Sequence, residues 1–180
     1  MTEFNKGSHE NALEYYKHSY DLLVNTEIPR VGPSVYLIND IGSILNIREQ
    51  YDQALEYYMR ALKISQDHSN YPVIAVSLGS IGIIYRIKGE YYCALNYQMR
   101  CLDMKKKNFP NEHREIAKIS DHIAAIFNGL GDFAGAMKYH QKSLKMHEKY
   151  LLNGHDNIES NFNHLAHLLT NQEKYNEALN

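Results

Sequence analysis

Tryptophan is absent from this chain of 180 residues, and cysteine occurs only twice. An excess of charge of one sign is also missing, because 19 lysines and arginines nearly balance 21 aspartates and glutamates. A duplex nucleic acid usually demands a clear positive excess from its partner, so we expect no nucleic-acid ligand. No apolar run approaches the roughly 18 residues that indicate a membrane span. We therefore expect no membrane partner.

The scarcity of cysteine leaves little room for cross-links. Cys93 and Cys101 fall in one predicted helix, where a rise of about 1.5 Å per residue separates their backbones by roughly 12 Å. A disulfide needs Cα atoms within about 7 Å, so we expect both thiols to be free and Cys101 to be a packing residue. The chain does not open with a basic segment followed by an apolar stretch, so no secretory signal is indicated. These features predict a reduced, cytoplasmic setting.

The motifs of common enzyme classes are missing as well. The sequence contains no glycine-rich phosphate loop, no His-Glu-x-x-His, no paired cysteine motif and no Gly-x-Ser-x-Gly elbow. Carboxylates are plentiful, but nothing in the pattern places two of them in an enclosed site. We expect no enzymatic activity and no cofactor.

What the sequence does contain is a repeat of about 42 residues. One column is Ala12, Ala54, Ala94, Ala136 and Ala178, with spacings of 42, 40, 42 and 42. The residues three before and three after it are aromatic in most repeats: Tyr51, Tyr91, Phe133 and Tyr175 before, and Tyr15, Tyr57, Tyr97 and Tyr139 after. An upstream column holds Leu45, Tyr85, Phe127 and Leu169. So many columns in one register indicate an array of structural repeats.

The spacing inside each repeat is helical. Ile38, Ile41 and Leu45 step by three and four residues, which places them on one stripe of a helix. Gly42 beside this stripe has no side chain and lets a second helix approach closely. Helix stops are expected in the turns, at Gly89 and at Gly129 with Gly131. The pattern predicts nine helices, at 8–24, 33–48, 51–66, 73–88, 91–107, 112–129, 132–150, 157–171 and 174–179.

Two segments near the end of the chain resemble the tetratricopeptide repeat family. Residues 162–166 (Phe-Asn-His-Leu-Ala) and 174–178 (Lys-Tyr-Asn-Glu-Ala) are similar to that family's Leu-Asn-Asn-Leu-Ala and Lys-Tyr-x-Glu-Ala pattern. The longer spacing is similar to that of kinesin-light-chain-like repeats. The resemblance implies an all-α fold, a right-handed superhelical solenoid of antiparallel helix hairpins, with HEAT-like helix pairs as the main rival.

The repeat boundaries predict a single array over 1–180. It would comprise a partial repeat at 1–30 that supplies only a second helix, full repeats at 31–70, 71–110 and 111–152, and a truncated repeat at 153–180. Neither end has a polar capping helix, so we expect a segment of a longer array that, alone, either frays at its last repeat or self-associates through its ends.

In this family the first helix of each pair, helix A, lines the concave face of the solenoid, and the second is helix B. Helix A positions off the apolar stripe are polar and rich in asparagine, whose amide both donates and accepts hydrogen bonds. Such a strip would suit an extended peptide, although asparagine on an exposed helix is also ordinary surface. The predicted peptide-binding residues are Asn39, Ser43, Asn46, Arg86, Asp121, Asn128, Asn163 and His167.

Other polar features have simpler interpretations. His122 and His164 occupy matching positions of neighbouring repeats, with His167 one turn further on. Their backbones would lie roughly 10 Å apart, too far for one zinc ion with bonds of about 2.1 Å, so we expect no metal site. Residues 105–107 are three lysines at the end of a helix, where they complement the helix dipole.

The resemblance therefore implies a protein-protein interaction scaffold or adaptor that binds a peptide or helical segment in the concave groove. The alternative is a regulatory or substrate-recruiting segment of a larger enzyme, because kinesin-light-chain-like arrays are found attached to catalytic domains such as ADP-ribosyltransferases.

Overall fold

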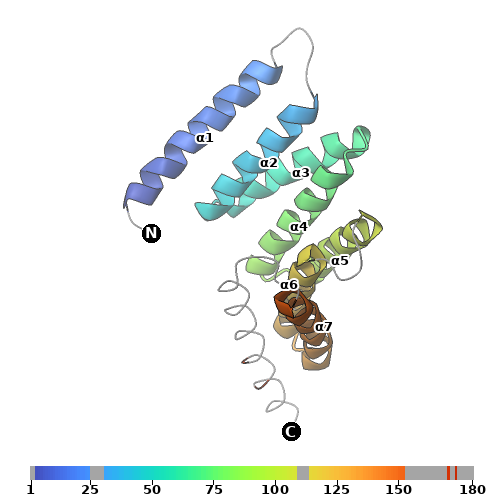
Figure 1. Cartoon of the computed structure of the whole chain (residues 1–180). Coiled ribbons are helices and arrows are strands. Elements are labelled where there is room, and N and C mark those ends of the chain that lie inside the picture. The colour runs from blue at the N-terminus through green and yellow to red at the C-terminus, as the bar shows by residue number, and fades with distance from the viewer. Residues whose placement is uncertain (1–2, 25–30, 109–113, 153–169, 171–172, 174–180) are drawn as a thin grey trace. The chain divides into compact units, whose positions relative to one another are not determined.

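The computed structural model describes residues 3–24, 31–108 and 114–152, together with Thr170 and Glu173. Within these residues the protein is all-α, with seven helices packed as consecutive hairpins (Figure 1). The helices are α1 (Glu3–Val24), α2 (Val31–Ile47), α3 (Tyr51–Asp67), α4 (Tyr71–Ile87), α5 (Tyr91–Asn108), α6 (Arg114–Gly129) and α7 (Phe133–Leu152). The predicted class, an all-α array of helix hairpins, is confirmed.

The first seven predicted helices match these seven, with one boundary clearly wrong. Helix α1 begins at Glu3 rather than at residue 8. The predicted helices at 157–171 and 174–179, and most of the truncated repeat, lie outside the described residues.

The first compact unit of the chain is Met1–Ile84. Its core is a cluster of side chains from α2, α3 and α4, with Tyr57 and Ile64 packed against it: Val35, Ile38, Ala61 and Val73. Helix α1 packs on α2, and Glu10 forms an ion pair of 3.6 Å with Arg48 in the turn after α2. This ion pair is largely exposed, so it adds little to stability, and apolar packing holds the unit together.

The second compact unit is Tyr85–Asn180, in which α6 packs against both α5 and α7. Two aromatic pairs recur here at the repeat spacing. The rings of Tyr85 and Tyr97 stack with centroids 5.5 Å apart, and those of Phe127 and Tyr139 do the same at 5.5 Å. Columns recognised in the sequence are therefore partners in space, each pair joining a helix A to the helix B that follows.

The alanine column confirms the predicted register. Ala54, Ala94 and Ala136 are each completely buried, at 0% exposure. An alanine there keeps the two helices of a hairpin close together, because any larger side chain would overfill the contact. Cys101 is also buried and Cys93 is exposed, and both thiols are free, as predicted.

The turns between helices A and B share one hydrogen-bond pattern. In each, the third residue after the helix donates its N–H to a carbonyl five residues earlier: Gln50 to Leu45 at 2.9 Å, Glu90 to Tyr85 at 2.8 Å and Asp132 to Phe127 at 2.9 Å. This pattern is the Schellman motif, and it requires a positive φ at the residue just before the donor. Gly89 (φ 78°) and Gly131 (φ 75°) do so as expected, but the first turn uses Glu49 (φ 61°).

Replacing Glu49 with glycine is expected to stabilise the protein. A residue with a Cβ is strained at positive φ by about 1 kcal/mol, and glycine removes that strain at this position. The expected gain is about 0.5–1 kcal/mol in the free energy of unfolding, measured by urea denaturation. Glu56→Gly, in the exposed interior of α3, is the matched control and should lose about 1 kcal/mol. A loss at both positions would contradict the strain at Glu49.

Candidate functional site

Helix α2 has one side that is buried and one that faces solvent. Its apolar stripe is buried in the unit, whereas Tyr36, Asp40, Ser43 and Ile47 are exposed. These four residues are spaced by four, three and four, so they form a single stripe along the helix. Two of them are large apolar side chains that remain half in water, Tyr36 at 50% and Ile47 at 42% exposure.

Helix α4 carries the same stripe 40 residues later. Val76, the counterpart of Tyr36, is 49% exposed, and Ser80, the counterpart of Asp40, is half-buried. We call these residues on the outward stripe of the two helices the α2–α4 face: Tyr36, Asp40, Ser43, Ile47, Val76 and Ser80. All of them belong to the first compact unit.

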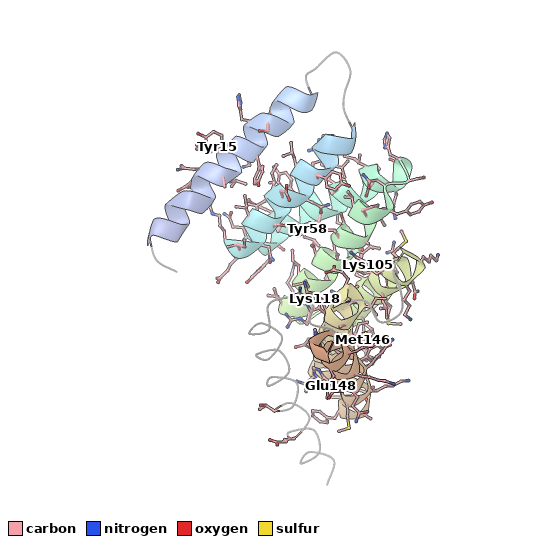
Figure 2. The ribbon with its side chains drawn as sticks, in the orientation of Figure 1. Tyr15, Tyr58, Lys105, Lys118, Met146 and Glu148 are labelled. Carbon is pink, nitrogen blue, oxygen red and sulfur yellow. The ribbon has the colours of Figure 1, made fainter. Side chains whose placement is uncertain are left out.

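Tyr58 of α3, labelled in Figure 2, links the two halves of this face through hydrogen bonds with serines of α2 and α4. Its ring is buried, and its hydroxyl donates to Ser43 Oγ of α2 at 3.1 Å. Burial raises the pKa of the Tyr58 phenol, and hydrogen bonds with Ser43 and with Ser80 of α4 partly offset that rise. Since one hydroxyl reaches serines on both helices, the middles of α2 and α4 lie side by side at this point.

The position of Tyr58 depends on Gly42. A Cβ on Gly42 would lie 2.8 Å from Tyr58 Cε1, which is closer than real Cβ contacts. The absent side chain lets the ring lie close to α2, so that its hydroxyl reaches Ser43 and Ser80. Gly42 therefore allows α2 and α3 to pack closely and also positions the Tyr58 hydroxyl at the serines of the α2–α4 face.

Asp40 supplies the charge of the face. It is the only Asp, Glu, Lys or Arg in residues 31–47 and 71–84, which make up α2 and the first-unit part of α4. Partial desolvation raises the pKa of its carboxyl above the usual range. Although the residue as a whole is exposed, its carboxylate has thus lost some of its hydration and would gain from a partner.

The predicted site residue Asn39 does not face solvent. It is 5% exposed, and its Oδ1 accepts a hydrogen bond of 3.1 Å from Ser77 Oγ of α4. The backbone carbonyl of Asn39 accepts from Ser43 Oγ at 3.0 Å. The expectation of an exposed amide at this position is wrong, because helix A is flanked by the next helix A as well as by helix B, which widens its buried sector. Ser43, in contrast, is exposed as predicted.

Asn46, Arg86 and Asn128 occupy one column in the last turn of α2, α4 and α6. Their backbone carbonyls accept the hydrogen bonds from Glu49, Gly89 and Gly131 that close the three turns. Asn46 and Arg86 are half-buried, and Asn46 Oδ1 and Arg86 Nε have no hydrogen-bond partner among the described residues. Asn128 is exposed. Nothing in the structure tests whether these side chains bind a peptide.

Asp121 lies in a buried polar cluster between α6 and α7. Its two carboxylate oxygens are 3.8 Å from His140 Nδ1 and 3.6 Å from His147 Nε2. The three side chains are only 4–11% exposed. The described part of the chain contains no group of three or more His, Cys, Asp or Glu residues that could hold a metal ion. The cluster therefore joins two helices and offers little surface to a ligand.

Asn163 and His167, the remaining predicted site residues, lie outside the described residues, and so does His164. Sequence reasoning missed Tyr36, Asp40, Ile47 and Val76. The signal that could have found them is the spacing of four, three and four on the side of helix A opposite the buried stripe. The predicted residues Asn39 and Ser43 lie two residues before and two residues after Ile41. Of these two, Asn39 faces the neighbouring helix α4.

Family models of the tetratricopeptide repeat match residues 34–107 and residues 117–157. Together these matches cover the three full helix pairs of the structure. The chain belongs to the tetratricopeptide repeat family.

Solved structures with this fold include proteins related to kinesin light chains. BtubC (BKLC) from P. vanneervenii has a TM-score of 0.82 at 15% identity, over 97% of this chain and 71% of that chain. The nearly identical TPR-like repeats of a kinesin-light-chain candidate from Podosopora anserina have a TM-score of 0.73 at 16% identity, over 97% and 84%. The apo form of RapI has 0.73 at 19% identity, over 98% of this chain and 48% of that chain. At such identities the likeness concerns the fold alone.

No curated protein matches the sequence significantly. Among the described helices, none is both long enough and apolar enough to cross a membrane.

Replacing Asn39 with alanine is expected to destabilise the fold. The change leaves the buried Ser77 hydroxyl without its acceptor, which costs about 1–3 kcal/mol in the free energy of unfolding. Asn128→Ala, at the exposed end of α6, is the matched control and should stay within about 0.5 kcal/mol of the parent. Equal stabilities of the two variants in urea denaturation would show that Asn39 is not a packing residue.

Proposed function

We propose that the α2–α4 face binds a segment of another protein in which apolar side chains flank a basic residue. Tetratricopeptide repeats mediate protein-protein interactions, and this chain belongs to that family. The face also consists of A helices, which the family uses to line its concave side.

The observation that carries the proposal is the exposure of Tyr36, Ile47 and Val76. Each is about half exposed, although the opposite side of both helices is buried in the unit. Several large apolar side chains on one face of two adjacent helices favour a contact surface, because covering them removes apolar area from water. Tyrosine in particular is enriched among the residues that contribute most to binding at interfaces.

The polar groups of the face favour a ligand with a hydrogen-bond donor or a cation. Asp40 stands among the apolar side chains as the single charge, and its partly desolvated carboxylate would regain stabilisation from a lysine or arginine. The Ser43 hydroxyl already donates to the Asn39 carbonyl and accepts from Tyr58, which leaves one lone pair that can accept a hydrogen bond from a peptide N–H. Apolar contacts would supply affinity, and Asp40 would select against acidic segments.

We also propose that this unit binds its partner without a chemical step. The α2–α4 face holds one carboxylate and three hydroxyls, and no imidazole or second acid of the face could exchange a proton with them. The grouping is suited to recognition rather than to acid-base catalysis.

Peptide selection can test the function directly. A library of displayed random 12-residue peptides is selected on the full chain, and the enriched peptides are titrated against purified variants. We expect enrichment of peptides with apolar residues beside lysine or arginine. Tyr36→Ala and Val76→Ala should each weaken binding by at least about 1 kcal/mol, or roughly fivefold. Tyr92→Ala, on α5, is the control for loss of an exposed tyrosine and should leave affinity unchanged.

The pH dependence of peptide affinity distinguishes the contribution of Asp40 from that of the apolar contacts. Because the pKa of Asp40 is raised, this carboxylate protonates at higher pH than an ordinary aspartate. Affinity for a basic peptide should therefore be full above that pKa and fall as the pH drops through it, and Asp40→Asn should abolish this dependence. If no enriched peptide loses affinity for the Tyr36 and Val76 variants, the α2–α4 face is not the binding site.

A further inference from the structure

Lysines from α5 and α7 converge on one side of the second unit. Lys138 and Lys142 are one turn apart on α7 and lie on the same side of that helix. Tyr139, next to Lys138, donates its hydroxyl to Met99 Sδ of α5 at 3.6 Å, so side chains of the two helices are in contact here. Lys106 follows Met99 by two helical turns on α5. We call Lys106, Lys138 and Lys142 the lysine cluster.

The cluster lies within a strongly basic pair of helices. Helices α5 and α7 contain eight lysines and arginines but only two acids, Asp103 and Glu148. In the whole chain, acids outnumber lysines and arginines by 21 to 19. Although the whole chain is nearly neutral, positive charge is therefore concentrated on α5 and α7, the B helices of the second unit.

The lysines of the cluster have no ion pair with any described residue, in contrast to lysines nearby. Lys105 and Lys118 flank Glu115 at 3.4 and 3.6 Å, and both are labelled in Figure 2. Burial opposes ionisation of Glu115, yet these two lysines hold the pKa of its carboxyl below the usual range. Glu115 thus already forms ion pairs with two lysines that lie outside the cluster.

The proximity of the three ammonium groups is reflected in Lys142, which is half-buried. Partial burial, followed by repulsion from Lys106 and Lys138, lowers the pKa of the Lys142 ammonium. Like charges held together without a counter-charge destabilise one another, and a bound anion would relieve that repulsion.

We propose that the lysine cluster is a second binding surface, which takes a protein segment with clustered acidic groups, either carboxylates or phosphates. Two acidic groups one helical turn apart would match the spacing of Lys138 and Lys142. This surface differs in chemistry from the α2–α4 face, and the inference does not depend on the function proposed for that face.

Nucleic acid is the less favoured polyanion for this surface. Duplex and single-stranded ligands spread their charge along a track, and proteins meet them with long basic grooves and aromatic stacking platforms. The cluster is short, and the most exposed tyrosine of α5, Tyr92 at 80% exposure, stands at the opposite end of that helix from Lys106. A compact group of acids on a protein fits three lysines better.

The test measures binding of a fluorescent hexaglutamate peptide to the full chain by anisotropy at low salt. We expect saturable binding that weakens as salt is added, and no binding of the hexaglutamine counterpart. Lys138→Glu/Lys142→Glu should weaken binding at least tenfold, and Lys142→Arg should retain it. Addition of the peptide should raise the pKa of Lys142, observed by NMR of the lysine side chain, because an anion favours the charged form.

The matched control is Lys17→Glu/Lys63→Glu, which makes the same change in net charge at exposed positions of α1 and α3. Thermal unfolding followed by circular dichroism verifies that each variant is folded. An equal loss of binding in the control would show that affinity follows net charge and would overturn the proposal. Failure of the parent to bind hexaglutamate would also overturn it. Tighter binding of a six-nucleotide oligothymidine that is lost in Lys138→Glu/Lys142→Glu would assign the surface to nucleic acid instead.

Discussion

The close approach of α2 and α3 at Gly42 is the contact on which the first unit and its exposed face depend. Without a Cβ at this position, the ring of Tyr58 lies against the α2 backbone and is almost completely buried. The same contact brings the phenol hydroxyl within reach of Ser43 of α2 and Ser80 of α4. One missing side chain therefore sets the distance between two helices and the arrangement of polar groups above them.

A comparable contact occurs in the second unit. A Cβ on Gly129 would lie 2.3 Å from Tyr91 Cε1, so the last residue of α6 makes room for the first residue of α5. In both units a tyrosine from a helix B fills space that a small helix A residue leaves open. Aromatic rings contribute large buried areas, which a solenoid needs because each hairpin is covered only by its neighbours.

Charge is distributed in opposite senses in the two units. In α2 and the first-unit part of α4 a single carboxylate stands among apolar and hydroxyl side chains, whereas α5 and α7 carry a large basic excess. Stacked repeats permit this arrangement, because each repeat contributes its surface without altering the core of the others. A protein of this kind can present different ligand chemistries from units that share one fold.

Much of this architecture could be predicted from the sequence, because repetition makes local patterns reinforce one another. The buried alanine column, the apolar stripe of helix A and the stops at Gly89 and Gly131 follow from residue size, from the helical period and from the backbone freedom of glycine. The turn at Glu49 was not predictable, because glutamate carries no signal for a positive φ. It adopts that conformation because the hairpin packing around it favours the same Schellman hydrogen bonds.

The exposed face was decided by tertiary structure. Asn39 and Ser43 stand at equal sequence distances from Ile41, and both are polar, so the sequence treats them alike. Only the packing of α4 against one flank of α2 buries Asn39 and leaves Ser43 in contact with solvent. Likewise, the sequence shows the lysines of α5 and α7 as separate groups, and only the contact between the helices brings them together. Helical periodicity determines which residues share a side of a helix, but which side remains open depends on the neighbours that the fold supplies.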